Sequence, residues 1–186
     1  MRDLSDFDIL SLPGTHSSGP DHWQTHWEAV FPNMRRVEQE DWDVPVYDDW
    51  SRRLTEAVDR CRRPVLLVAH SLGTALVARW AQEANSRTVA GAFLVATSDV
   101  DRLAATPGYR MRGFAPAITK RLPFPTMVLA SRNDDRVTFE RARAFASAWG
   151  SSFVDVGALG HIGSAAQLGL WPQGLVWLGQ FIASVS

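Results

Sequence analysis

The sequence has few of the features that would assign it to a specialised class of protein. It contains a single cysteine, Cys61, in 186 residues, which excludes a disulfide framework and a zinc site built from thiolates. Its 19 basic and 20 acidic residues nearly cancel, so no charge excess would attract nucleic acid or an anionic membrane. No apolar run is long enough to span a membrane, and the first residues, M-R-D-L-S-D-F-D, lack the apolar core of a signal peptide. These absences predict a cytoplasmic protein without a nucleic-acid or membrane partner.

What the sequence does contain is an alternation of strand-like apolar runs and helix-like segments. Hydrophobic residues make up 46% and charged residues 21% of the chain, as in an ordinary globular protein. Strands are predicted at residues 7–12, 34–39, 65–69, 88–96, 126–130 and 152–156. Helices are predicted at residues 22–31, 51–61, 72 onward, 139–149 and 175–185. Asp21 is expected to cap the first of these helices and Ser51 the second. This order predicts one α/β domain over residues 1–186, with about six mostly parallel strands and helices on both faces.

The most informative stretch runs from Pro64 to Arg79 and reads P-V-L-L-V-A-H-S-L-G-T-A-L-V-A-R. Its first half is typical of a strand buried on both faces, and the apolar residues of its second half recur at helical spacing. A sharp strand-to-helix turn therefore falls at Ser71. Such a turn exposes a nucleophilic hydroxyl and directs the next backbone N–H, that of Leu72, at an oxyanion. The sequence A-H-S-L-G departs from the usual G-x-S-x-G at Ala69, whose methyl group is the smallest side chain that this close approach could still admit.

A nucleophilic serine needs a base to take its proton and a carboxylate to orient that base. In a parallel sheet, such groups collect at the carboxyl ends of the strands. The predicted fifth strand runs into S-R-N-D-D, which contains Asp134, and the sixth runs into G-A-L-G-H, which ends at His161. We therefore predict Ser71 as the nucleophile, His161 as the base and Asp134 as the acid.

The other histidines fit the role of base less well. His70 is adjacent to the serine and cannot turn back onto its hydroxyl, and His16 follows the first strand rather than the last. His22 and His26 lie one helical turn apart, but no third ligand stands at a suitable spacing, so no metal site is expected. No organic cofactor is implied either.

The choice of carboxylate stays open between neighbours. Asp135 follows Asp134 directly, and Asp99 and Asp101 come after the fourth strand, where some hydrolases carry the acid. Asp134 is preferred because it comes first after its strand, and because a buried aspartate without a partner would be costly.

The loop after the first strand is the expected source of the second oxyanion donor. The backbone N–H of Thr15 is the first candidate and that of His16 the second. His16, His70, Trp42 and Trp50 are the expected substrate-binding residues, the two tryptophans because their loop falls on the catalytic edge of the sheet.

Taken together, these residues resemble the small serine hydrolases of the retinoblastoma-binding-protein-9-like family, a compact branch of the α/β-hydrolases. The resemblance covers nearly the whole chain and rests on L-P-G at 12–14, S-G-P-D-H-W-Q at 18–24 with Trp27, D-W at 41–42, Pro45, D-W at 49–50, A-H-S-L-G at 69–73, S-R-N-D at 131–134, G-H at 160–161, and W-P at 171–172 with Gly174. It implies a minimal α/β-hydrolase fold without a large cap domain, a triad of Ser71, Asp134 and His161, and hydrolysis of a small-molecule ester. Bacterial members often carry proline and an aromatic residue after the triad aspartate, where this chain has Asp135 and Arg136.

Three functions are compatible with these residues. The first is hydrolysis of small carboxylic esters, the second is cleavage of a thioester or amide, and the third is a binding or regulatory module whose triad is idle. The L-x-C-x-E motif associated with pocket-protein binding by the animal namesake is missing, so that role is not expected here. The sequence identifies no other protein partner.

Overall fold

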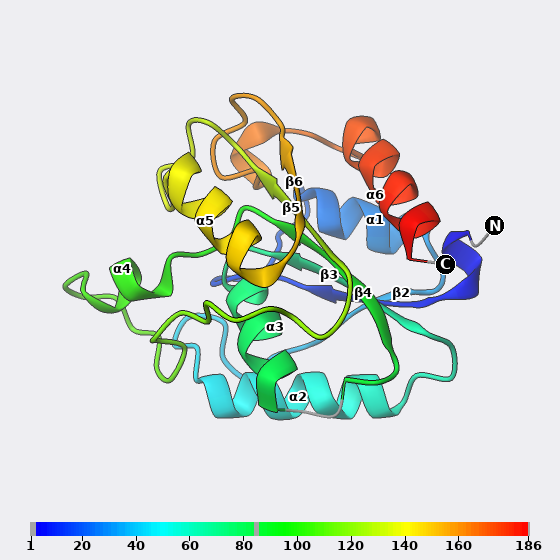
Figure 1. Cartoon of the computed structure of the whole chain (residues 1–186), viewed down its shortest axis with the longest axis horizontal. Helices are drawn as coiled ribbons and strands as arrows, with labels where there is room; N and C mark the ends of the chain where they lie inside the picture. The colour runs from blue at the N-terminus through cyan, green and yellow to red at the C-terminus, as the bar shows by residue number, and fades with distance from the viewer. Residues whose placement is uncertain (1–2, 84–85, 186) are drawn as a thin grey trace.

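The computed structural model of the chain describes residues 3–83 and 86–185, and within these residues its centre is a six-stranded sheet. The strand order is β2-β1-β3-β4-β5-β6, and every neighbouring pair is parallel (Figure 1). The strands are β1 (Asp8–Leu12), β2 (Met34–Arg36), β3 (Val65–His70), β4 (Val89–Val95), β5 (Thr126–Ala130) and β6 (Ser152–Asp155). The predicted parallel α/β sheet is confirmed, and all of its carboxyl ends lie on one edge.

Helices cover both faces of this sheet. One face carries α2 (Tyr47–Asp59), α3 (Leu72–Glu83) and α5 (Phe139–Trp149), and the other carries α1 (Trp23–Val30) and α6 (Pro172–Ser184) (Figure 1). In β3, Leu67 and Ala69 pack among the first group while Leu66 and Val68 pack among the second. All four side chains are fully buried, which explains the unbroken apolar run in this strand.

The connection between β4 and β5 contains no large cap domain. In this described part of the chain it forms only the short helix α4 (Val100–Ala104), and the rest is irregular. Two short 3-10 helices, at Leu4–Asp6 and Ser164–Ala166, complete the elements. In the described chain, no large domain therefore covers the carboxyl edge of the sheet.

The start of α2 differs from the prediction. The helix begins at Tyr47 after Val46, so Ser51 lies inside it and caps nothing. Instead of a side-chain cap, the N–H of Tyr47 donates to the carbonyl of Arg112 (2.9 Å), and the N–H of Arg112 donates to the carbonyl of Pro45 (2.8 Å). A pairing with a segment more than 60 residues away in sequence satisfies this helix end, which local sequence could not reveal.

The start of α1 also differs by one residue. His22, and not Asp21, is the N-cap, and its Nδ1 accepts a hydrogen bond from the N–H of Gln24 (3.1 Å). Because His22 is buried, the cap holds its imidazole ring in a fixed position inside the protein. Two boundaries also shift: β2 ends at Arg36, and α6 begins at Pro172.

Helix α3 approaches strand β1 closely at Gly73. A Cβ atom on Gly73 would lie 2.2 Å from the carbonyl oxygen of Leu12 and 2.9 Å from that of Pro13. Both contacts are with backbone, which cannot swing away as a side chain can. A glycine is therefore required where the helix leaves the strand.

We predict that Gly73→Ala destabilises the protein by about 3 kcal/mol, because α3 or β1 must shift to admit the methyl group. The matched control is Gly179→Ala in α6, where a Cβ would meet no atom within 4 Å. Alanine favours a helix over glycine by about 1 kcal/mol, so the control is expected to be neutral or stabilising. Urea unfolding of both variants measures the difference, and equal free energies of unfolding would contradict the prediction.

Candidate active site

The turn between β3 and α3 holds Ser71 in an uncommon backbone conformation. Its φ angle is 54°, in the left-handed region that residues other than glycine seldom adopt. The N–H of Ser71 donates to the carbonyl of Val95 (3.1 Å), and the carbonyl of Ser71 accepts from both the N–H (2.9 Å) and the hydroxyl (2.7 Å) of Thr74. The Thr74 hydroxyl in turn accepts from the N–H of Ser98 (3.3 Å). Groups of α3 and of the chain at the end of β4 therefore hold the serine in place.

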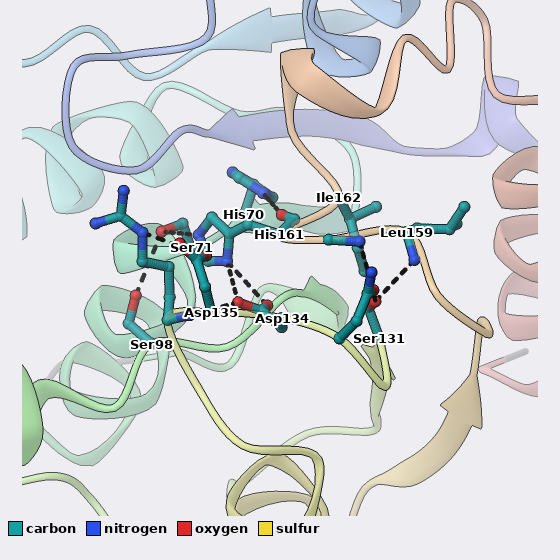
Figure 2. A network of polar contacts seen from close by, with 12 residues as sticks. His70, Ser71, Ser98, Ser131, Asp134, Asp135, Leu159, His161 and Ile162 are labelled. Atoms are coloured by element: carbon teal, nitrogen blue, oxygen red, sulfur yellow. Dashed lines mark hydrogen bonds and ion pairs between the residues drawn. The ribbon is translucent and has the colours of Figure 1, made fainter.

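His161 lies between Ser71 and Asp134 (Figure 2). Its Nε2 is 2.8 Å from the Oγ of Ser71, and its Nδ1 is 2.9 Å from each carboxylate oxygen of Asp134. The Asp134 side chain is only 1% exposed, and its Oδ1 also accepts from the N–H of Arg136 (2.8 Å). A carboxylate bound to Nδ1 places the imidazole proton there and leaves the Nε2 lone pair facing the serine hydroxyl.

Hydrogen bonds hold the loop that carries His161, three of them from the end of β3 and the segment after β5. The Oγ of Ser131 accepts from the N–H of Leu159 (2.9 Å), and the Oδ1 of Asn133 accepts from the N–H of Gly160 (2.8 Å). The third is the carbonyl of His161 itself, which accepts from Nε2 of His70 (2.8 Å; Figure 2). Sequence reasoning missed the roles of Ser131 and Asn133, although their polar side chains stand directly after a buried strand in the segment that carries Asp134.

The alternative carboxylates lie elsewhere. The Asp135 side chain is 77% exposed and faces Nε of Arg136 at 3.5 Å. Asp99 caps α4, and both Asp99 and Asp101 pair with Arg141. The geometry therefore places Asp134, and none of these three, against the imidazole of His161.

Two further imidazoles beside His161 remain neutral. Burial lowers the pKa of His70 well below its ordinary value and lowers that of His22 to about 4. The ring of His70 contacts those of both His22 and His161, with centroid separations of 4.7 and 5.0 Å. At neutral pH neither of these rings therefore adds a positive charge beside His161.

A cavity of about 230 Å³ opens beside the Ser71 hydroxyl. The loop after β1, the ends of β3 and β4, and the loop of His161 form its wall, which includes His16 and His70 as expected. It also includes His22, Ser98, Tyr109 and Arg136, none of which the sequence analysis assigned to substrate. Those residues come from loops and a helix cap whose meeting point depends on the fold.

The expectation for Trp42 and Trp50 is corrected. Neither belongs to the described residues that line the cavity. Trp50 is 1% exposed and packs in the core against Phe114, and Trp42 packs edge-on against Trp50. An amphipathic α2 that starts earlier than predicted turns the Trp50 indole inward, where it buries more apolar surface than at the cavity rim.

The loop after β1 brings backbone N–H groups close to Ser71. A Cβ on Gly14 would lie 2.6 Å from Cβ of Ser71 and 3.1 Å from the backbone nitrogen of Leu72. The N–H of His16 is taken by the carbonyl of Trp42 (2.9 Å). In the described part of the chain, the N–H groups of Thr15 and Leu72 have no hydrogen-bond partner. This leaves Thr15, rather than the reserve candidate His16, available to a ligand.

No group of three or more histidine, cysteine or acidic side chains within residues 3–83 and 86–185 could hold a metal ion. Among the helices described, none is both long and apolar enough to cross a membrane.

Comparison with known proteins agrees with this arrangement. The sequence model of the family described as serine hydrolase matches residues 9–180. The chain belongs to the serine hydrolase family. The retinoblastoma-binding-protein-9-like hydrolases that the sequence resembles form part of the same family. No curated protein matches the sequence.

Solved structures similar to this serine hydrolase share its α/β-hydrolase fold. A protein from Pectobacterium atrosepticum described as a YdeN-like hydrolase is 32% identical, with a TM-score of 0.85 over 97% of this chain and 93% of that one. The ydeN gene product of B. subtilis is 17% identical, with a TM-score of 0.71 over 95% and 99%. An esterase domain from Rhodothermus marinus is 19% identical, with a TM-score of 0.66 over 96% and 88%.

The lowered pKa of His22 predicts a loss of stability in acid. Between pH 6.5 and pH 4 the unfolded chain takes up a proton at His22 while the folded serine hydrolase does not, so the free energy of unfolding falls as pH falls. The full effect is about 3 kcal/mol at pH 4. His22→Asn removes the titrating ring and retains a side chain that caps helices well. We expect a shallower pH dependence of stability for this variant in urea unfolding from pH 7 to 4, and an unchanged slope would contradict the assignment.

Proposed function

We propose that this serine hydrolase cleaves small carboxylic esters by acyl transfer to Ser71. The observation that carries the proposal is the continuous hydrogen-bonded series from the Ser71 hydroxyl through His161 to Asp134, opening on a cavity. The Nε2 of His161 takes the hydroxyl proton while Oγ of Ser71 forms a bond to the ester carbonyl carbon. Asp134 orients the ring and stabilises the imidazolium that forms.

Two backbone N–H groups are proposed to stabilise the oxyanion. Leu72 and Thr15 have free N–H groups among the described residues, and they lie on the two segments that meet at Gly14 and Ser71. Collapse of the tetrahedral intermediate breaks the ester C–O bond, and the imidazolium gives its proton to the departing alcohol oxygen. Water then repeats the sequence on the acyl-enzyme, releasing the acid and restoring the Ser71 hydroxyl.

Labelling with a fluorophosphonate probe tests the nucleophile and the acid. Intact-mass analysis is expected to show one adduct on the wild type and none on Ser71→Ala. Asp134→Asn should slow labelling about 100-fold or more, because the asparagine amide favours the wrong tautomer of His161. Asp135→Asn is the matched control at the next position, and its labelling rate is expected to stay within about twofold of the wild type.

The same experiment separates the alternatives. A folded wild type that resists labelling would favour the idle binding module over the hydrolase. Equal slowing in both aspartate variants would contradict the choice of Asp134.

A second test addresses the oxyanion donors. Gly14→Ala places a methyl group where it contacts both Ser71 and the backbone nitrogen of Leu72. Loss of one oxyanion donor costs about 100-fold in kcat, so a fall of that size is expected for hydrolysis of an aryl ester. Gly19→Ala in the same loop is the control, since a Cβ there would meet no atom within 4 Å. Similar kcat values for the two variants would place the oxyanion elsewhere.

A further inference from the structure

The catalytic cavity has an unbalanced positive charge. Arg136 belongs to its wall, whereas no aspartate or glutamate of the described residues does. The carboxylate of Asp134 lies behind His161 and is 1% exposed, and His22 and His70 are held neutral by burial. A ligand in this cavity therefore meets a guanidinium without a competing carboxylate in the wall.

The backbone of Arg136 has a fixed position relative to the nucleophile. Its N–H donates to Oδ1 of Asp134, the carboxylate that also binds His161. From the other side, the guanidinium of Arg102 donates to the carbonyls of Asp135 (3.3 Å) and Arg136 (3.5 Å). The segment that carries Arg136 is thus held both by the candidate triad and by α4.

The guanidinium itself is available to a ligand. The Arg136 side chain is 57% exposed, and its one ion pair, from Nε to Asp135 at 3.5 Å, is with a side chain that is 77% exposed. Ion pairs as exposed as this contribute at most about 1 kcal/mol. The two terminal nitrogens have no partner anywhere in the described chain. Their fixed fork matches the two oxygens of a carboxylate.

We propose that Arg136 binds a carboxylate on the substrate, so that the site prefers esters carrying a negative charge a few bonds from the reacting carbonyl. This inference rests on the ester hydrolysis proposed above. Ser71 and Arg136 line the same cavity of about 230 Å³, and this small volume limits the distance between the carbonyl and the charge. Tyr109, whose hydroxyl lies 3.1 Å from that of Thr15, lines the same cavity and supplies a neutral polar group there.

Two pairs of nearly isosteric esters test the proposal, with kcat/KM measured by proton NMR. Monomethyl succinate and methyl 4-oxopentanoate differ by a carboxylate or a methyl ketone on the acyl side. Acetoxyacetate and acetoxyacetone differ in the same way on the alcohol side. We expect the wild type to prefer the anionic member of at least one pair about tenfold or more, and added salt to reduce that ratio.

The variants assign the preference to Arg136. Arg136→Gln is expected to lower the ratio of anionic to neutral kcat/KM about tenfold, and Arg136→Lys to lower it less, because lysine retains the charge and loses the fork. The matched control is Arg132→Gln, four residues earlier in the same segment, where the arginine pairs with Asp155 (2.7 Å) outside the cavity. This control should keep the wild-type ratio.

The outcomes distinguish failure of the proposed role of Arg136 from failure of the proposed ester hydrolysis. Hydrolysis with the same ratio in wild type and Arg136→Gln would overturn the role of Arg136 and leave the esterase proposal standing. A wild type that hydrolyses none of the four esters would contradict the proposed ester hydrolysis, and with it the proposed preference for anionic esters.

Discussion

The close contact between Gly73 and the carbonyl of Leu12 sets the geometry on which the rest of the site depends. It allows α3 to start directly against the end of β1, so the turn at Ser71 can be sharp enough to hold a left-handed φ. The chain leaving β1 then passes Ser71 at Gly14, so closely that a Cβ on Gly14 would lie 3.1 Å from the backbone nitrogen of Leu72. One steric condition therefore brings together Ser71 and the two N–H groups proposed for the oxyanion, which have no partner among the described residues. Ala69, the first residue of the A-H-S-L-G sequence, is fully buried and packs in the same cluster as the residues of α3.

Hydrogen bonds between loops fix the positions of Ser71, Asp134 and His161. These residues follow three different strands, and backbone N–H groups bound to side-chain oxygens tie their loops to neighbouring segments. Thr74 links the turn to the segment after β4, and Ser131 and Asn133 link the loop after β5 to the one after β6. Groups held in this way need no rearrangement when charge develops, which is the condition for effective electrostatic stabilisation of a transition state.

Most of the fold could be read from the sequence because its signals are local. The buried strand ahead of Ser71, the change to helical spacing after it, and the Gly150 stop of α5 each depend on near neighbours in sequence. The geometry around Ser71, His161 and Asp134 was anticipated for the same reason, since parallel strands bring their carboxyl ends to one edge. The start of α2 was not, because Arg112 supplies its cap from a distance. Arg136, Ser98 and His22 reach the cavity only through long-range packing, and the inward turn of Trp50 has no local signal either.

The charges of the site connect the charge of the substrate with proton transfer to His161 in the proposed reaction. In the proposed acyl transfer His161 would become positive, and the negative charge of Asp134 would balance it. Arg136 adds a second positive charge that its exposed pair with Asp135 offsets only weakly. With a neutral ester bound, the guanidinium would oppose formation of the imidazolium. With an anionic ester bound, the substrate carboxylate would compensate the guanidinium charge before the proton moves. Arg136 would then contribute in two ways. It would attract the substrate, and once the substrate carboxylate is bound, its charge would no longer repel the positive charge on His161.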